Sequence, residues 1–360
     1  MSYDCVNVTD AAETEWVQVS SKPSVLDLIL RLHVHIGLCY KKLGDDRESI
    51  ITFEDAYKIM RTASKVPSSS KSLMIPIISS LCVLQMAQPA LDNRTKSKQE
   101  KLLEKFVTEA MNSRSTVHVG RALCMQAVFH SRFGDLEKAC SVIDRLRNVY
   151  NVEKYSASMT EEYGRDYAIE TLAESVQWYY LLEDHERADE QADTVIEIYL
   201  PLVDPLDVDA CMNVILPIVQ VFRLTSRADD AEWLLKRYVI NPSHDHASNS
   251  HFWVPLFNPL AYVIELILME ESDEFDEDTI LEMEGWVLEQ SDVDYAEELE
   301  KKAFCLIGEI CWRLANYRDE GDEIRDQLEH KAKELLKPVA RYPHGEFFLR
   351  KTAQALMDAF

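Results

Sequence analysis

Histidine and aspartate side chains gather in the segment NPSHDHASNSHF, residues 241–252. His244, Asp245, His246 and His251 are residue types that bind zinc or copper. The segment is polar and adds no further ligand at a fixed spacing. We therefore interpret it as a solvated linker and keep a metal site as the alternative.

A second cluster of possible ligands is the acidic sequence DEFDED, residues 273–278, which is similar to the start of a calcium-binding loop. Such a loop needs glycine at its sixth position for a sharp turn, and this chain has Asp278 there. The spacing therefore does not predict a calcium site.

The motifs of the common catalytic classes are missing from the sequence. We find no GxxxxGK[ST] phosphate loop, no GxSxG elbow and no HExxH pair. The segment HERAD begins like HExxH, but Asp189 stands where the second histidine should be. The sequence thus predicts a protein that is not an enzyme and needs no cofactor.

The charge of the chain is strongly negative, −25 over 360 residues, which disfavours nucleic acid as a partner. Between Glu270 and Glu300 there are fifteen acidic residues and no Lys or Arg. This stretch is interpreted as a solvated acidic face, with a docking surface for a basic partner as the alternative.

Features of targeting predict a cytoplasmic protein that contacts no membrane. No apolar run reaches the roughly 20 residues needed to cross a bilayer, and the first residues lack the basic and apolar regions of a signal peptide. The 8 cysteines are scattered without a CxxC pair, mostly within apolar periodic stretches, as is typical of reduced thiols.

The elements that would carry any binding surface are amphipathic helices joined in hairpins. The stretch GLCYKKLGDDRESIITFEDA, residues 37–56, has a Gly-Asp turn, an Asp45–Glu48 capping box and apolar residues at spacings of three and four. Similar hairpins recur at 122–146, 172–199 and 214–238. The equivalent positions Ser49, Ala139, Ala188 and Ala231 are 90, 49 and 43 residues apart, which indicates a period of about 45 if one unit lies in the first gap.

This pattern predicts an all-α fold, an α-α superhelix in which about seven antiparallel helix pairs form a right-handed solenoid. We divide the chain into a flexible leader (1–22), a helical repeat array (23–343) and a C-terminal capping helix (344–360).

The first hairpin resembles the tetratricopeptide repeat. Gly37, Tyr40, Gly44, Phe53 and Ala56 match its small, aromatic, turn-glycine, aromatic and alanine positions. The second unit keeps Leu123, Ala127, Gly134 and Ala139 but has His130 for the Tyr. The third and fourth units keep mainly the aromatic and the alanine, and the period is longer than that of the family. The resemblance implies a concave groove lined by the first helix of each hairpin. Projecting the groove-facing positions onto this chain gives the candidate peptide-binding residues Arg31, Lys41, Lys42, Arg121, Arg132, Gln177, Tyr180, Asn213, Gln220 and Arg223.

The function that follows is a non-catalytic scaffold or adaptor that binds a partner peptide or domain in this groove. Because the candidates include several Lys and Arg in an acidic protein, we expect an acidic or phosphorylated partner. The alternative for these cations is an ordinary role near helix C-termini. The alternative for the whole chain is a helical sensor or regulatory segment of a larger multidomain ATPase or signalling enzyme. The sequence leaves open the partner's identity, the oligomeric state and whether the chain is complete.

Overall fold

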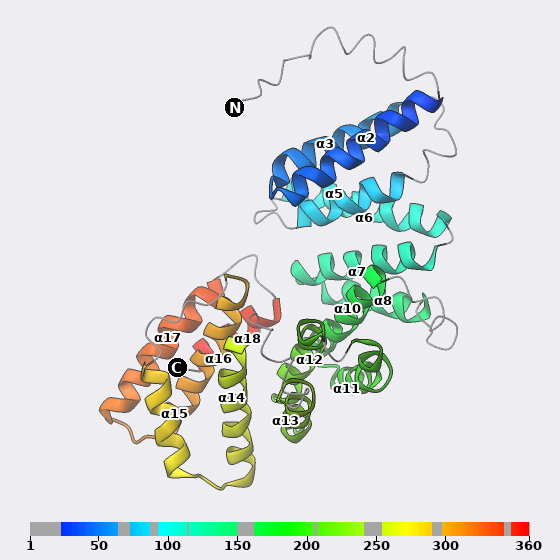
Figure 1. Cartoon of the computed structure of the whole chain (residues 1–360). Helices are drawn as coiled ribbons and strands as arrows, with labels where there is room; N and C mark the ends of the chain where they lie inside the picture. Colours follow the sequence, from blue (N-terminus) through cyan, green and yellow to red (C-terminus); the bar gives the residue numbers. More distant parts are fainter. Residues whose placement is uncertain are drawn as a thin grey trace. The chain divides into compact units, whose positions relative to one another are not determined.

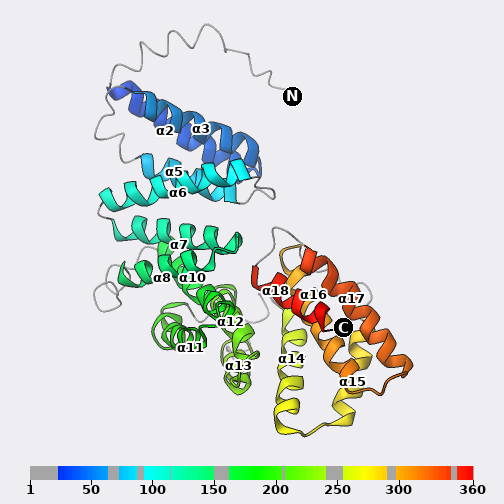
Figure 2. The ribbon, with the colours of Figure 1, turned by 180° about the vertical axis from the view of Figure 1, so that it is seen from behind.

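A computed structural model describes residues 23–63, 73–86, 93–113, 115–149, 162–204, 207–240, 254–289, 297–341 and 347–359. All regular structure in these ranges is helical, and the all-α prediction is confirmed (Figures 1 and 2). The predicted leader 1–22 and the His244–His251 segment lie outside the described residues. Contacts divide the chain into two compact units, Met1–Gln126 and Ala127–Phe360, called unit 1 and unit 2 below.

Unit 1 begins with two helix pairs, and the division between the units falls inside the helix that follows them. Its helices are α2 (Pro23–Lys42), α3 (Asp46–Thr62), α5 (Met74–Met86), α6 (Asn93–Ser113) and the first part of α7 (Thr116–Arg132). Helix α3 packs against both α2 and α5, and α5 packs against α6.

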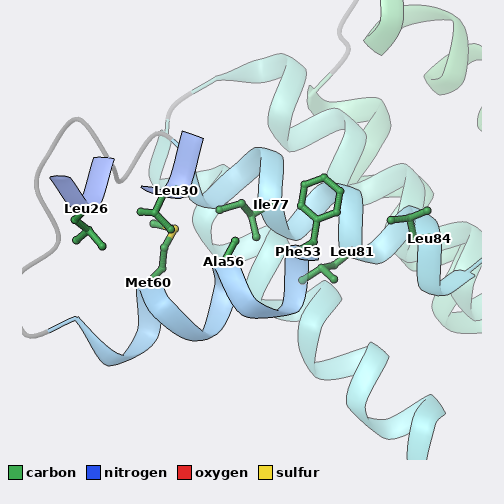
Figure 3. Close-up of a cluster of buried hydrophobic side chains, with 8 residues drawn as sticks. All are labelled: Leu26, Leu30, Phe53, Ala56, Met60, Ile77, Leu81 and Leu84. Atoms are coloured by element: carbon green, nitrogen blue, oxygen red, sulfur yellow. The ribbon is translucent and has the colours of Figure 1, made fainter. Parts of the chain in front are cut away.

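Helices α2, α3 and α5 of unit 1 share one buried apolar cluster. Figure 3 shows the buried cluster that joins α2, α3 and α5, which consists of Leu26, Leu30, Phe53, Ala56, Met60, Ile77, Leu81 and Leu84. Gly37 makes this packing close, because a Cβ atom there would lie 2.7 Å from the Phe53 ring. The first hairpin is therefore held by a large side chain fitted against a residue without one.

Unit 2 contains the remaining helices, which follow one another in pairs. They are α8 (Leu136–Val149), α10 (Glu162–Leu181), α11 (His185–Thr194), α12 (Val208–Phe222), α13 (Ala228–Leu235), α14 (Val254–Ser272), α15 (Glu277–Glu289), α16 (Glu297–Asn316), α17 (Glu323–Arg341) and α18 (Phe347–Asp358). Short turns of other helix types, Val195–Tyr199, Leu200–Leu202 and Lys236–Ile240, extend α11 and α13. Helix α10 packs against α8, α11 and α12, while α16 packs against α14 and α17.

The same tight turn closes three of the hairpins. In each, a backbone N–H donates to the carbonyl five residues earlier, from Asp45 to Tyr40, from Asp135 to His130 and from Asp184 to Tyr179 (3.0, 2.9 and 3.1 Å). The residue before each aspartate has a left-handed φ, at Gly44, Gly134 and Glu183. The third hairpin thus keeps the turn without its glycine, which explains why the repeat is harder to read in later units.

The position expected to be equivalent in successive hairpins is buried in all four. Ser49, Ala139 and Ala231 are 0% exposed and Ala188 is 2% exposed. Ser49 stands where the other units have alanine, and its buried hydroxyl is satisfied because it donates to the Gly37 carbonyl at 2.8 Å. The repeat interpretation therefore rests on equal burial as well as on equal spacing.

Candidate functional site

The sides of α10 and α12 that pack against each other bring together three of the candidate binding residues. Gln177 of α10 and Gln220 of α12 are 43 residues apart, and the Gln177 Nε2 donates to the Gln220 Oε1 at 2.5 Å. One to two turns away, Asn213 Nδ2 donates to the Glu170 Oε1 at 3.1 Å, again across 43 residues. Residues at equivalent positions of consecutive hairpins therefore form a polar ladder between the two helices.

A small cleft of about 110 Å³ opens beside this ladder. It is lined by Glu170, Glu174, Gln177, Asn213, Leu216, Pro217 and Gln220 and by Lys302 of α16. The lining is mostly polar, with two carboxylates and one ammonium group. Such a surface suits hydrogen bonding to a polar ligand better than burial of an apolar one.

Helix α12 contributes a buried glutamine and a proline to the lining of this cleft. Gln220 is 2% exposed, and its Nε2 has no hydrogen-bond acceptor among the described residues. Pro217 lies inside α12 and has no N–H, so it cannot donate to the Asn213 carbonyl four residues earlier. The lining of the cleft thus includes a buried amide donor without an acceptor among the described residues, and α12 lacks one of its usual main-chain donors at Pro217.

The next candidate along α12, Arg223, meets a carboxylate of its own chain. Its guanidinium pairs with Glu309 of α16, and both side chains are buried. Glu309 also accepts from Arg313 Nη2 at 3.1 Å, and Arg313 pairs in turn with Glu270 of α14. Arg223 therefore belongs to an internal network of ion pairs that joins α12, α14 and α16.

Electrostatics keep this network charged. Burial alone raises the pKa of Glu309, but Arg223 and Arg313 together lower it below its ordinary value. A carboxylate at this depth is stable only with such partners, because each unpaired buried charge costs several kcal/mol, on the order of the stability of a domain. The network therefore fixes how α16 lies against α12.

Tyr180 of α10 also faces the C-terminal part of unit 2. Its ring centroid is 6.4 Å from that of Phe348 in α18 and 5.2 Å from that of His185. The predicted capping segment 344–360 contains α18, which packs against α17 and α16 and touches α10. Part of the inner face expected to hold a partner is thus occupied by α16 and α18.

The remaining candidate residues lie on α2 and α7, and none of them lines the cleft. Arg31 is exposed and its Nε lies 2.7 Å from the Asp27 carboxylate, whereas Lys41 and Lys42 are exposed in the last turn of α2. Arg121 is half-buried, and Arg132 is the exposed last residue of α7. Lys41, Lys42 and Arg132 have the positions that the helix-end alternative requires.

Sequence reasoning missed Glu309 and Arg313 as partners of the inner face. The sequence contains a signal for them, because Glu309 interrupts the apolar run CLIGEICW at 305–312. A charged residue surrounded by apolar ones on a buried helix needs an opposite charge. Which distant residue supplies that charge cannot be read from this run.

Among the residues that the structure describes, no group of three or more His, Cys, Asp or Glu side chains is placed to hold a metal ion. The cysteines described there are free, and burial raises the pKa of Cys82 and Cys311 to about 12. No described helix is long and apolar enough to cross a membrane.

Stacked helical hairpins with repeated turns and repeated buried small residues define an α-helical repeat protein. Residues 30–61 match the tetratricopeptide repeat, and this match covers the first hairpin of unit 1. No curated protein matches the sequence. With its further hairpins, the chain is a tetratricopeptide-like helical repeat protein, a type of fold that serves protein–protein interaction in general.

Proposed function

We propose that the chain is a non-catalytic interaction scaffold and that the cleft between α10 and α12 binds an extended segment of a partner protein. The observation that carries this proposal is that Gln220 lines the cleft and that its buried Nε2 has no acceptor among the described residues. A main-chain carbonyl of a bound segment is an acceptor that this amide can use.

The partner's charge is the finer part of the proposal. At this cleft the carboxylates of Glu170 and Glu174 face the single ammonium of Lys302, and Arg223 is committed to Glu309. The expected preference for an acidic or phosphorylated segment therefore depends on Arg31, Lys41, Lys42, Arg121 and Arg132. At the cleft itself we propose main-chain recognition with little charge selection.

The alternative role, a regulatory segment of a larger ATPase or signalling enzyme, remains a prediction from general helical character. It would use the same hairpins as contact surfaces, so the experiments below apply to both roles.

The test begins with a random-peptide display library selected on the whole folded chain. The selected peptide is then titrated by calorimetry against the unaltered protein and against Gln220→Ala. Removing the amide donor should weaken binding about tenfold, the loss expected for one hydrogen bond at a buried site. Gln327→Ala, an exposed amide on α17, is the matched control and should leave the affinity unchanged.

A second variant separates binding from folding. Asn213→Ala removes the hydrogen bond to Glu170 and leaves Gln220 in place, so a cleft that binds through the Gln220 amide should keep most of its affinity. Equal affinities for all the variants would contradict the proposal, as would a selected peptide whose binding is lost only with cations of α2 or α7.

A further inference from the structure

A second concave surface lies between α13 and α14 of unit 2, away from the residues proposed to bind the partner segment. It encloses about 350 Å³ and is lined by Leu235, Ala261, Ile264 and Leu268, with Glu232, Lys236 and Glu265 at its edges. We call it the α13–α14 groove. Its floor is apolar, since Ile264 and Leu235 are 1% and 6% exposed. Ala261 is exposed and small, which leaves room for a side chain from outside.

The surroundings of this groove are negatively charged. Helices α14 and α15 with the turn between them, Val254–Ser272 to Glu277–Glu289, contain eleven Asp and Glu and no Lys or Arg. Only Glu284 among these carboxylates is buried, where it pairs with Arg318. Glu270 is engaged by Arg313, and the others remain exposed at the surface of unit 2.

Glu265 lies at the edge of the groove, between its apolar floor and the acidic surroundings. Partial burial and the carboxylates Glu232, Glu282 and Asp276 raise its pKa, and the ammonium group of Lys236 opposes this shift. That lysine already pairs with Glu232 of the same helix. Glu265 makes no ion pair with another described residue, so a cation brought to the groove would relieve repulsion among carboxylates from three segments.

We propose that the α13–α14 groove is a docking site for a basic amphipathic helix of a partner protein. A large apolar side chain of that helix enters between Leu235 and Leu268 over Ala261, and its Lys or Arg residues meet Glu265 and Glu282. Charge complementarity selects this occupant. An acidic helix would add repulsion, and a neutral helix would not reduce the repulsion among the carboxylates. The inference does not rest on the proposed function, since it uses other residues and an opposite charge.

The probe is a synthetic helical peptide of Leu and Lys in an amphipathic order, carrying a fluorescent label. A second labelled peptide, used for comparison, has the same sequence order with Glu in place of Lys. Fluorescence anisotropy with the full chain should show at least about tenfold tighter binding of the basic peptide at low salt, and this preference should shrink as salt rises.

Two variants locate the binding. Ala261→Trp fills the groove with an indole ring and should weaken the basic peptide about tenfold or more, as expected for blocking an anchor pocket. Glu265→Gln should weaken it about two- to fivefold, the range for an exposed ion pair. The matched controls are Ala355→Trp on α18 and Glu186→Gln on α11, both at exposed positions outside the groove.

Circular dichroism and the urea midpoint of each variant establish that it is folded. If Ala261→Trp is not folded, Ala261→Met with Glu265→Gln tests the same groove with a smaller side chain. Equal binding of the acidic and basic peptides, or unchanged binding after the groove is filled, would overturn the proposal. Sedimentation that shows a dimer dissociated by Ala261→Trp would also overturn it, because the occupant would then be a second copy of this chain.

Discussion

The first helix of a hairpin has opposite surroundings in the two units. In unit 1, α2 buries Leu26 and Leu30 against α3, yet Leu28, Leu32 and Ile36 on other faces are 45–58% exposed. In unit 2, α10 and α12 are buried on nearly every side. The candidate residues follow the same division, since Lys41 and Lys42 are exposed while Gln220 and Arg223 are buried.

This difference shows what the repeat pattern determines about each helix and what it leaves open. The repeat pattern determines which residues face the second helix of the same hairpin, and these are alike in both units. It does not determine whether another part of the chain covers the remaining face. In unit 2 that cover comes from α16 and α18, through the pairing of Arg223 with Glu309 and of Tyr180 with Phe348.

The largest predicted effect is a difference in stability between two variants, Arg223→Leu in unit 2 and Arg31→Leu in unit 1. Arg223→Leu leaves Glu309 with Arg313 alone in a buried site and should lower the free energy of unfolding by about 3–5 kcal/mol. Arg31→Leu removes an exposed pair with Asp27 and should change it by less than about 1 kcal/mol. Urea unfolding of both variants measures the contrast.

A double variant provides the control for this measurement. Arg223→Leu combined with Glu309→Leu removes both charges, and Arg313 keeps Glu270 as a partner. The double variant should be more stable than Arg223→Leu alone, because no carboxylate is left underpaired. Equal losses for Arg223→Leu and Arg31→Leu would mean that the network adds nothing to unit 2.

Lowering the pH should destabilise unit 2 before unit 1. The pKa of Glu309 is lowered in the folded state, so its pairing stabilises unit 2 above the ordinary glutamate pKa, and this contribution is lost as pH falls through the lower folded value. None of the Asp and Glu side chains described in unit 1 is buried. Unfolding followed from about pH 7 to pH 3 should therefore weaken unit 2 first, and hydrogen exchange by mass spectrometry reports each unit separately.

Glycine substitutions test the packing that the two units share. A Cβ atom at Gly37 would lie 2.7 Å from Phe53, and one at Gly308 would lie 2.7 Å from Leu336. Gly37→Val and Gly308→Val should each cost about 1–3 kcal/mol from overpacking. Gly285 has no atom within 4 Å of such a Cβ, so Gly285→Ala on α15 should stabilise by about 0.5–1 kcal/mol. Thermal unfolding of the three variants checks this order of stabilities. A Gly308→Val variant of unchanged stability would show that the Leu336 side chain moves aside at little cost.

Local features of this fold could be predicted from the sequence because their causes are local. Asp45 caps α3 by accepting from the Glu48 N–H at 3.1 Å, as the capping box predicts. The turn glycines Gly44 and Gly134 adopt the left-handed conformation. Hairpin order and the buried small residue also follow from spacing.

The candidate site was predictable only in part. Gln177, Asn213 and Gln220 meet in one cleft, since equivalent positions of adjacent hairpins must lie side by side. The role of Arg223 could not be predicted, because its partner Glu309 is 86 residues away and no repeat spacing joins them. Long-range pairing of this kind depends on how the hairpins stack, and a single sequence does not state it.

The smallest expected effect decides between the two interpretations of Lys41 and Lys42. As helix-end cations, they stabilise α2 by about 0.3–1 kcal/mol, and Lys41→Gln with Lys42→Gln should remove that amount. As part of a binding surface, they should matter for affinity, so the same double variant should weaken a phosphoserine-containing acidic probe peptide at least about fivefold, a change of roughly 1 kcal/mol. Arg47→Gln, an exposed cation in the first turn of α3, is the matched control. Loss of stability with unchanged affinity would assign these lysines to the helix dipole, and the acidic partner would then have no support from α2.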